Sequence, residues 1–315
     1  MDSQVNITYI TVDGYVEMHK YRFLYFVIFF SAYILIICSN STIVYLIWIH
    51  QNLHEPMYIF IAALLINSVV FSTAIYPKLF IDFLSEKQII SYSACLFQFH
   101  VFYSLAGSEF LLLAAMSYDR YVSICKPLQY PTIMKKTTVS IFLVLAWLVP
   151  AVECAVPAVL NANKKLCSFI LKGIFCNNTV YKLHCVISES QVIRDMIILL
   201  NVVLLPILFI LFSYTRILII SYRSSGEVRR KAAQTCLPHL IVLINFSCLV
   251  FFDVIVIRLE SYFPKPVRLI MTLQVVLYNP LFNPIIYGLK MKEISKHLKK
   301  LFCPAKMNQC LNTDK

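Results

Sequence analysis

The sequence has few charged residues and few glycines for a chain of 315 residues. Only 14% of its residues are Asp, Glu, Lys or Arg, whereas soluble proteins carry about 25%. A chain with so little charge cannot cover a surface that faces water, which argues against a soluble domain. The five glycines are too few for a large β-barrel with many turns. The eleven cysteines include no Cys-x-x-Cys pair, so a zinc site is not expected.

Apolar residues are abundant instead, at 59% of the chain, and the mean hydropathy is +0.74. They gather in seven runs, each long enough to cross the ~30 Å hydrocarbon core of a bilayer as a helix. The runs cover residues 23–49, 57–83, 93–124, 139–160, 196–221, 236–257 and 267–289. The sequence therefore predicts an all-α membrane protein with a bundle of seven transmembrane helices.

The segment that follows the last run is amphipathic. Ile294, Leu298 and Leu301 recur at helical spacing in residues 291–303, and lysines lie between them. This pattern predicts a short eighth helix on the membrane surface, with membrane lipid as a partner. Cys303 is a candidate for palmitoylation. We expect three parts: an N-terminal segment at 1–22, a transmembrane domain at 23–289, and an amphipathic helix and tail at 290–315.

The net charge of +12 comes from short basic blocks between the apolar runs and after the last of them. Such blocks are typical of cytoplasmic loops beside anionic lipid, whereas a nucleic-acid-binding protein has a basic patch or stripe. We therefore expect the N-terminus outside, the C-terminus inside, and no nucleic-acid partner. The two Asn-x-Thr sequons that lie outside the apolar runs predict glycosylation at Asn6 and Asn177.

Several short motifs occur in a fixed order along the chain. Residues 53–58 read Leu-His-Glu-Pro-Met-Tyr, residues 77–78 Pro-Lys, and residues 116–121 Met-Ser-Tyr-Asp-Arg-Tyr. Residues 231–240 read Lys-Ala-Ala-Gln-Thr-Cys-Leu-Pro-His-Leu, and residues 279–288 read Asn-Pro-Leu-Phe-Asn-Pro-Ile-Ile-Tyr-Gly. Together these motifs resemble those of odorant receptors, a branch of the rhodopsin-like G-protein-coupled receptors. The resemblance implies a receptor in the plasma membrane that binds a small odorant and activates a heterotrimeric G protein of the stimulatory class.

The resemblance also implies an activation switch. In the family, Arg120 turns toward the G protein in the active state, and Asp119 restrains it at rest. Pro284 leaves a backbone carbonyl unpaired that Asn283 can compensate, so this helix can have two arrangements of similar energy. Tyrosines are expected to meet near the arginine, although each tyrosine could equally be an interfacial anchor. The predicted switch residues are Asp119, Arg120, Tyr121, Tyr214, Asn283, Pro284 and Tyr287.

A mostly apolar ligand pocket is expected between the outer half of the third helix and the fifth and sixth helices. Its chemistry would suit a small organic molecule, but aromatic and aliphatic residues at helical spacing are equally consistent with plain packing. Ser247 stands where the family commonly has Tyr, so the pocket floor is expected to differ. The candidate lining residues are Phe102, Tyr103, Ala106, Gly107, Ile198, Leu199, Val202, Ser247, Val250, Phe251 and Val254.

Four cysteines are placed for disulfide bonds at the outer face, where an oxidising environment favours them. Cys95 opens the third run, and Cys167, Cys176 and Cys185 lie in the long loop after the fourth. Four cysteines allow three pairings, and the residues alone do not choose among them. The resemblance implies the pairs Cys95–Cys176 and Cys167–Cys185.

Glu109 lies in the middle of the third run, where an acid is costly unless it has partners. The family often places a second carboxylate opposite, on the second helix, but this chain has Ser68 there. This chain therefore lacks one of the two carboxylates that a sodium site between these helices would use. We expect a polar cluster of Asn40, Ser68, Glu109 and Asn279, and no bound metal.

Other functions fit the sequence less well. The last run has no Lys for a retinal Schiff base, and the outer part of the third run has no Asp of the kind amine receptors use. A non-olfactory rhodopsin-like receptor remains the nearest alternative. A transporter would favour internal repeats and interrupted half-helices, which the chain lacks. An enzyme would need a catalytic cluster, and we identify neither catalytic residues nor a cofactor motif.

Overall fold

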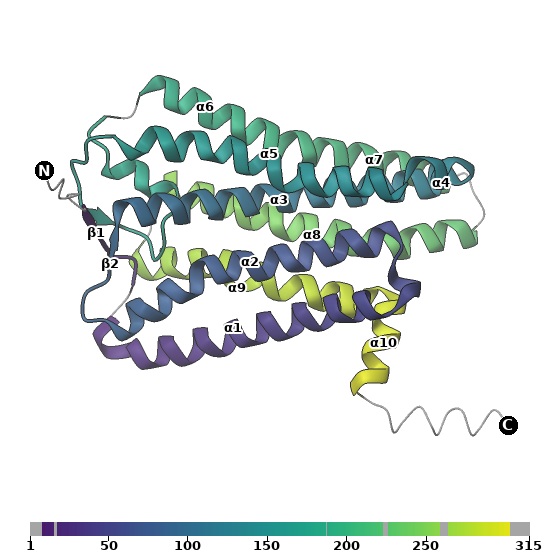
Figure 1. Cartoon of the computed structure of the whole chain (residues 1–315), viewed down its shortest axis with the longest axis horizontal. Helices are drawn as coiled ribbons and strands as arrows, with labels where there is room; N and C mark the ends of the chain where they lie inside the picture. Colours follow the sequence, from purple (N-terminus) through teal and green to yellow (C-terminus); the bar gives the residue numbers. More distant parts are fainter. Residues whose placement is uncertain (1–7, 16–17, 187, 223–225, 259–263, 303–315) are drawn as a thin grey trace, which may run out of the picture.

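The computed structural model describes residues 8–15, 18–186, 188–222, 226–258 and 264–302, with backbone only for 18–19, 227–235, 252–258, 271 and 302. Seven long helical segments pack into an elongated bundle (Figure 1). They are α1 (Met18–Ile49), α2 (Pro56–Leu84), α3 (Tyr92–Cys125), α5 (Lys136–Ala162), the continuous α6 (Glu189–Leu199), η4 (Leu200–Leu204) and α7 (Leu205–Tyr222), α8 (Gly226–Arg258) and α9 (Lys265–Lys290).

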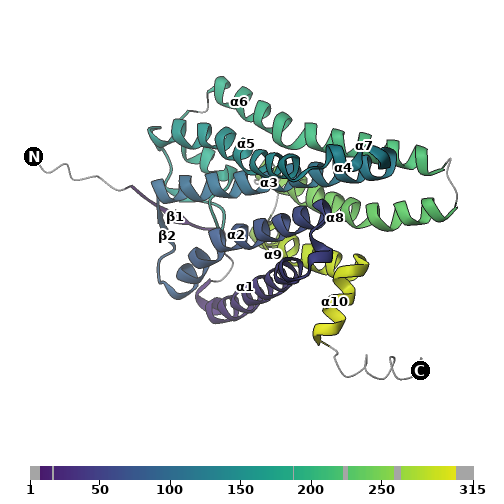
Figure 2. The ribbon, with the colours of Figure 1, turned by 45° about the vertical axis from the view of Figure 1, so that its right-hand side comes forward.

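Six of these segments are long and apolar enough to cross a membrane, and α8 contributes a shorter apolar stretch, Cys236–Phe251, within its described side chains. The amphipathic α10 (Lys292–Phe302) follows α9 and turns away from the bundle axis (Figure 2). The predicted fold class, a seven-helix membrane bundle with a short eighth helix, is confirmed. One boundary differs clearly: α6 begins at Glu189, well before the predicted start at residue 196.

Prolines and small polar residues mark the helix limits and irregularities. Pro56 occupies the first turn of α2, where its missing N–H costs nothing. The Ser91 hydroxyl caps α3 by accepting a hydrogen bond from the Ala94 amide at 3.3 Å. Pro150 and Pro157 lie inside α5 without breaking it. The η4 segment is a single π-helical stretch that ends two residues before Pro206.

A three-stranded sheet lies at one end of the bundle, which we call the sheet end. Strand β1 (Tyr9–Val12) pairs antiparallel with β2 (Ile89–Ser91) and parallel with β3 (Ile170–Leu171), in the order β2-β1-β3. The short helix η3 (Asn178–Leu183) belongs to the same loop as β3. This sheet was not predicted, because the residues before the first helix read only as a polar segment.

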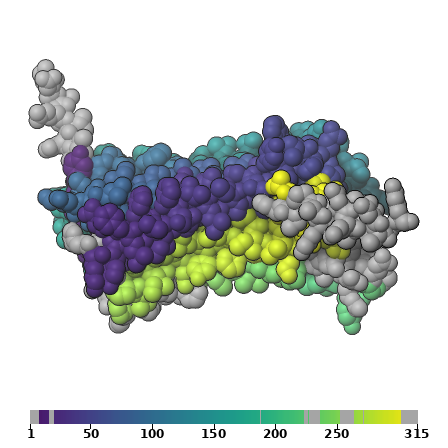
Figure 3. Space-filling model, turned by 90° about the horizontal axis from the view of Figure 1, so that it is seen from below, coloured from purple at the N-terminus to yellow at the C-terminus, as the bar shows by residue number. Residues whose placement is uncertain are grey.

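The opposite end, which we call the α10 end, carries the remaining short elements (Figure 1). These are η1 (Gln51–Leu53) between α1 and α2, and η2 (Pro127–Gln129) with α4 (Tyr130–Ile133) between α3 and α5. Helices α1 and α9 lie against each other along one face of the bundle (Figure 3), and α10 contacts both of them.

The distribution of polar and apolar side chains is the reverse of that in a soluble protein. Large hydrophobic side chains point outward, among them Trp48, which is 73% exposed, and Phe97, which is 69% exposed. Glu109 is only 2% exposed, in the interior. Lipid solvates the apolar exterior, while buried polar groups need partners within the bundle.

The buried hydrophobic residues form two cores, one in each half of the bundle. The core of the sheet half includes Phe71, Tyr76, Phe99 and Phe175, and the core of the α10 half includes Phe60, Phe110, Phe246 and Tyr287. Buried polar residues lie between the two along the helices. We call five of them the polar layer: Asn40, Ser68, Glu109, Asn279 and Asn283.

Candidate functional site

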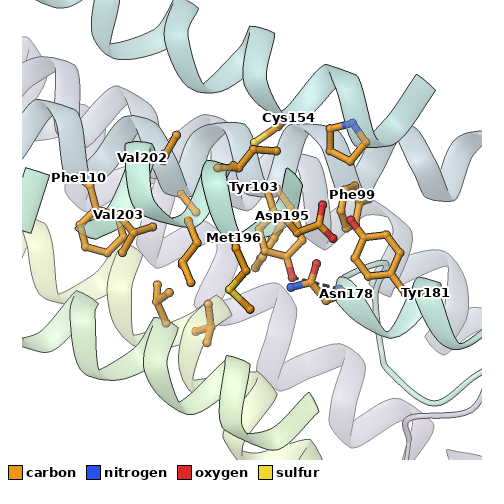
Figure 4. Close-up of a pocket in the computed structure, with 18 of the residues that line it drawn as sticks. Phe99, Tyr103, Phe110, Cys154, Asn178, Tyr181, Asp195, Met196, Val202 and Val203 are labelled. Atoms are coloured by element: carbon orange, nitrogen blue, oxygen red, sulfur yellow. Dashed lines mark hydrogen bonds between the residues drawn. The ribbon is translucent and has the colours of Figure 1, made fainter. Parts of the chain in front are cut away.

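A cavity of about 400 Å³ lies inside the bundle, bordered mainly by α3, α5, α6, η4 and α8. Small-molecule sites typically enclose roughly 300–1,000 Å³, so the cavity is of suitable size for a compact ligand. One end is apolar, with Phe110, Val202 and Val203, and the other carries Tyr103, Asn178, Tyr181 and Asp195 (Figure 4).

Eight of the predicted pocket residues border this cavity. They are Phe102, Tyr103, Ala106, Gly107, Ile198, Leu199, Val202 and Val250. Two predicted residues do not: Ser247 is absent from the lining, and Phe251 is 64% exposed on the outside of α8. The choice of Phe251 was wrong because its position on the helix turns its ring toward lipid. The side chain of Val254 lies outside the described residues.

Apart from Tyr103, the polar residues of the cavity were missed by the sequence prediction. Asn178, Tyr181 and Lys182 come from η3, and Gln191 and Asp195 come from α6. Residues before 196 read as loop because Arg194 and Asp195 interrupt the apolar run. The helix nevertheless extends back to Glu189, and this turns Asp195 toward the cavity. An acid directly before an apolar run was the available signal.

The polar end of the cavity is internally hydrogen-bonded. The Tyr103 hydroxyl accepts a hydrogen bond from the backbone N–H of Asn178 at 3.0 Å, and the Tyr181 phenol donates to the Asp195 carboxylate. Burial raises the pKa of Tyr181, and the nearby Asp195 carboxylate raises it further. Both effects keep the phenol protonated, so it remains a hydrogen-bond donor at neutral pH.

Gly107 lets α3 approach its neighbours closely beside the cavity. A Cβ atom there would lie 2.3 Å from Cγ1 of Val202 and 2.9 Å from Cβ of Pro150. Val202 belongs to the π-helical stretch, so the irregular turn and the glycine fit together. A larger residue at position 107 would force α3 apart from α5 and η4 and change the cavity wall.

Both disulfides implied by the resemblance are present at the sheet end. Cys95 at the start of α3 is bonded to Cys176, and Cys167 is bonded to Cys185 within the same loop. Together they hold β3 and η3 over the cavity. Near them, the Tyr92 hydroxyl lies 2.8 Å from Nε2 of His184. Burial lowers the pKa of His184, and the positive charge of Lys164 lowers it further.

The N-terminal strand is tied to the same end. Asp13 pairs with Lys265 at 2.7 Å, and the Tyr15 hydroxyl donates to Asp82 at 3.4 Å. Burial raises the pKa of Tyr15, and the Asp82 carboxylate adds to the effect. The residues directly after β1 therefore connect the start of α9 and the end of α2 at the sheet end.

The structure contradicts one predicted glycosylation site. Asn177 is buried, and its side-chain oxygen accepts hydrogen bonds from the amide and the hydroxyl of Thr179. A glycan on this side chain would have no room beside the Cys95–Cys176 disulfide in the folded chain. Asn6, the other predicted site, lies outside the described residues.

Three residues of the predicted cluster, Ser68, Glu109 and Asn279, come together with Asn283, whereas Asn40 bonds to backbone carbonyls. The Asn279 amide donates to Glu109 at 2.6 Å, and Asn283 donates to both Glu109 and Ser68 at 3.1 Å. Glu109 is therefore held by two amide groups from α9, and no second carboxylate faces it at Ser68. Among the described residues, no group of three or more His, Cys, Asp or Glu side chains is placed to hold a metal ion.

The unpaired carbonyl beside Pro284 is compensated by a different residue from the one predicted. Pro284 has no N–H for the carbonyl of Pro280, one helical turn earlier. Asn40 of α1 donates to that carbonyl at 2.9 Å, while Asn283 faces Glu109. The assignment of this role to Asn283 was wrong because the Asn283 side chain points toward Glu109 and not toward the Pro280 carbonyl.

Arg120 and Asp119, at the α10 end, form the predicted ion pair. Arg120 Nε donates to Asp119 at 2.8 Å, its Nη2 contacts the same carboxylate, and both residues are buried. The Tyr130 phenol from α4 donates to the other oxygen of Asp119 at 2.8 Å. Burial raises the pKa of Tyr130, with Asp119 adding to it, so the phenol stays protonated. Tyr121 is half-buried against the core of the α10 half.

The other two switch tyrosines lie in the same core. Tyr214 is within electrostatic range of both Arg120 and Tyr287, and its hydroxyl has no hydrogen-bond partner among the described residues. The Tyr287 hydroxyl lies 3.5 Å from Nδ1 of His239 on α8. The structure thus gathers residues from α3, α7, α8 and α9 beside the arginine.

Helix α10 packs against the end of the bundle by its apolar face. Ile294 is fully buried, and Leu298 packs near Gly288 of α9. The His297 ring stacks on His50 with 3.8 Å between ring centroids. Leu301 stays half exposed, and Phe302 and Cys303 fall outside the described side chains.

Comparison with known proteins places these features in one family. A sequence family model for olfactory receptors matches residues 29–305. Human olfactory receptor 11A1 is 35% identical over 303 residues, which cover 94% of each chain, and human olfactory receptor 11H2 is 33% identical over 88% of this chain and 85% of its own. The structure is similar to squid rhodopsin, with a TM-score of 0.71 at 18% identity, over 91% of this chain and 82% of that one.

Proposed function

We propose the function of this chain from one premise: it belongs to the olfactory receptor family. It is a multi-pass membrane receptor, not an enzyme, and it signals from an odorant to a G protein. The observation that carries our proposal for the site is the cavity inside the bundle. The Arg120–Asp119 ion pair is formed at the α10 end, away from this cavity. We infer that the odorant occupies this cavity.

The proposed signal path runs along α3 and α9. Gly107 and Phe110 border the cavity, and Glu109 between them is bonded to Asn279 and Asn283 of α9. A ligand that favours a different packing of α3 would therefore change the polar layer. Such a ligand shifts the population toward the active state only if it binds that state more tightly.

The proposed output of this path is release of Arg120 from Asp119. Tyr214 and Tyr287 lie beside the arginine and have hydroxyl groups that are weakly bonded or unpaired. They are suited to accept the arginine in an alternative arrangement. Pro284 and its turn of α9 supply the adjustable backbone, and Tyr121 lies next to Arg120 at the surface that a G protein would contact.

The proposed orientation places the sheet end outside the plasma membrane and the α10 end in the cytoplasm. Disulfide bonds at the sheet end suit the oxidising exterior, and the basic loops of the other end suit the cytoplasm. Residues 1–22 would then be extracellular, residues 23–289 would form the membrane domain, and residues 290–315 would be cytoplasmic. The lysines of α10 would contact anionic lipid.

We further propose coupling to the stimulatory class of G protein, which raises cyclic AMP. The test measures cyclic AMP in cells that express the full chain, with a panel of small odorants that includes amino acids. Arg120→Ala should abolish the response at equal surface expression, because the G protein loses its contact. Lys87→Ala, which removes an exposed charge at the sheet end, is the matched control.

Two outcomes would contradict the proposal. A full response in Arg120→Ala would show that this arginine is not the switch. Silence across the panel, with the parent receptor at the cell surface, would count against these odorants with stimulatory coupling and direct the next assay to another ligand class or another G-protein class.

A further inference from the structure

We propose that the cavity binds a zwitterion with an apolar body, of the kind represented by an α-amino acid with a large aliphatic or aromatic side chain. This inference rests on the proposed use of the cavity as the ligand site. The observation behind it is that the wall carries one carboxylate and one ammonium group, from Asp195 of α6 and Lys182 of η3. No other Asp, Glu, Lys or Arg lines the cavity in the part of the chain that the structure describes.

Asp195 has unused capacity to accept hydrogen bonds. Its side chain is 30% exposed, although it belongs to a helix that crosses the membrane. The carboxylate accepts from the Tyr181 phenol, and Nε of Arg194 lies 3.7 Å from one of its oxygens. An ionised carboxylate has about four acceptor positions, so an incoming ammonium group can bind without displacing either neighbour.

The surroundings of Asp195 favour a ligand that also carries a negative charge. Lys164 is bonded to the side-chain oxygen of Gln191, and Arg194 lies beside them. Nε2 of Gln191 and two guanidinium nitrogens of Arg194 are buried without a hydrogen-bond partner among the described residues. Lys164 and Arg194 lie behind the lining, and with Lys182 they outnumber the single carboxylate of Asp195 at this end of the cavity. A simple amine would be repelled there, whereas a carboxylate beside an ammonium group matches both signs.

The opposite end of the cavity accommodates the rest of the ligand. Phe110, Val202 and Val203 form an apolar wall deeper in the bundle (Figure 4). The Phe246 ring, which also lines the cavity, lies 4.7 Å from that of Phe110 between centroids. An aliphatic or aromatic side chain would be removed from water there, which contributes roughly 25 cal/mol for each Å² buried. Charges at one end and apolar surface at the other define the ligand as amphipathic and fix its direction in the cavity.

The test compares four probes that share the 3-methylbutyl group. L-Leucine carries both charges, 3-methylbutylamine lacks the carboxylate, 4-methylpentanoate lacks the ammonium group, and 3-methylbutan-1-ol is neutral. Binding is measured by the thermal shift of the purified full-length receptor, and activation is measured by cyclic AMP in cells. We expect leucine to bind most tightly, at least about tenfold more tightly than either singly charged probe, because a charged hydrogen bond contributes ~1.5–3 kcal/mol.

Two variants test which cavity residue binds each charged group of the ligand. Asp195→Asn should weaken the binding of leucine and of 3-methylbutylamine at least about tenfold and leave the binding of 4-methylpentanoate unchanged. Lys182→Gln should weaken the binding of leucine and of 4-methylpentanoate, and it should leave the binding of 3-methylbutylamine unchanged or make it tighter. Glu189→Gln on the same helix and Lys165→Gln in the same loop remove exposed charges away from the cavity and are the controls.

The outcomes separate this inference from the proposed function. If a neutral odorant activates the receptor through Arg120 while leucine neither activates nor stabilises it, the receptor function stands and the zwitterion inference is overturned. If leucine stabilises the parent but not Asp195→Asn, and cyclic AMP stays flat, the inference stands and stimulatory coupling fails. Equal binding of all four probes, or leucine binding that is indifferent to both variants, would also overturn it.

Discussion

The two halves of the bundle are held together by different kinds of contact. The sheet half has two disulfide bonds, a three-stranded sheet and the Asp13–Lys265 ion pair, all at its outer rim. The α10 half has no disulfide among its described residues and depends on the Asp119–Arg120 pair, the Tyr130 hydrogen bond and the docking of α10. Covalent bonds persist through a conformational change, whereas ion pairs and hydrogen bonds can exchange partners.

This difference matches the two tasks of a receptor. The cavity lies next to the cross-linked half, where a fixed wall reduces the entropy that a ligand must remove on binding. The arginine pair lies in the half whose contacts can be replaced by others of similar energy. The polar layer between them carries hydrogen bonds from α3 to α9, so a change in one half reaches the other through named contacts.

Breaking the disulfides should have the largest effect. Cys95→Ala with Cys176→Ala opens a loop of 81 residues, and Cys167→Ala with Cys185→Ala opens one of 18. Chain entropy predicts losses of about 4.5 and about 3 kcal/mol as upper limits, since inserted helices remain constrained when the receptor unfolds. The melting temperature of the purified receptor measures both. Equal losses from the two double variants would contradict the loop-length argument.

Removing Asn40 tests whether α1 supports the proline turn of α9. Asn40→Leu leaves the Pro280 carbonyl unpaired in the interior, which costs about 1–3 kcal/mol. In a Pro284→Ala background, the backbone N–H at position 284 can bond that carbonyl, so the same change should cost much less. Thermal unfolding measures both losses, with Ser39→Ala as the control. The same cost in both backgrounds would refute the assignment.

Loosening the arginine pair should act on activity rather than on stability. Tyr130→Phe removes one hydrogen bond from Asp119 but leaves Arg120 in place, a change of about 1 kcal/mol. Basal cyclic AMP should therefore rise about fivefold. Tyr118→Phe, whose ring packs against Phe142, is the control. A fall in basal signal would show that the Tyr130 contact supports the active state instead.

The smallest expected effect is a pH dependence of α10 docking. Burial, and then the positive neighbours His50 and Lys300, lower the pKa of His297. A base whose pKa is lowered by docking loses stability as pH falls, since the undocked state binds the proton more readily. Docking should weaken as pH falls below the ordinary histidine value of about 6.5. Hydrogen exchange of α10 measures this, and His297→Gln should remove the dependence.

The transmembrane segments were predictable because hydropathy over a bilayer-length window is a local property of the chain. Glu109 was also recognisable, since an acid in an apolar run needs partners wherever they come from. Its partners were harder to predict. Asn283 was assigned to the proline turn because it is adjacent in sequence, but Asn40, 240 residues before Pro280, donates to the carbonyl instead. Sequence proximity does not show which way a helical side chain points.

Asp195 illustrates the same limit at the ligand site. Its charge suggested a loop, but packing of α6 against the bundle extended the helix and directed the carboxylate into the cavity. Phe251 is the opposite case, since its apolar ring suggested the pocket and faces outward.

The sequence by itself determined that the chain crosses the membrane as a helical bundle, and its motifs determined the family that it resembles. Both depend on residue types and on spacing within short segments. Only the tertiary structure decided which charges line the cavity, which amide compensates the proline turn, and how the N-terminal strand closes the sheet end. These depend on helix rotation and on contacts between distant segments, which the packing of the whole bundle sets.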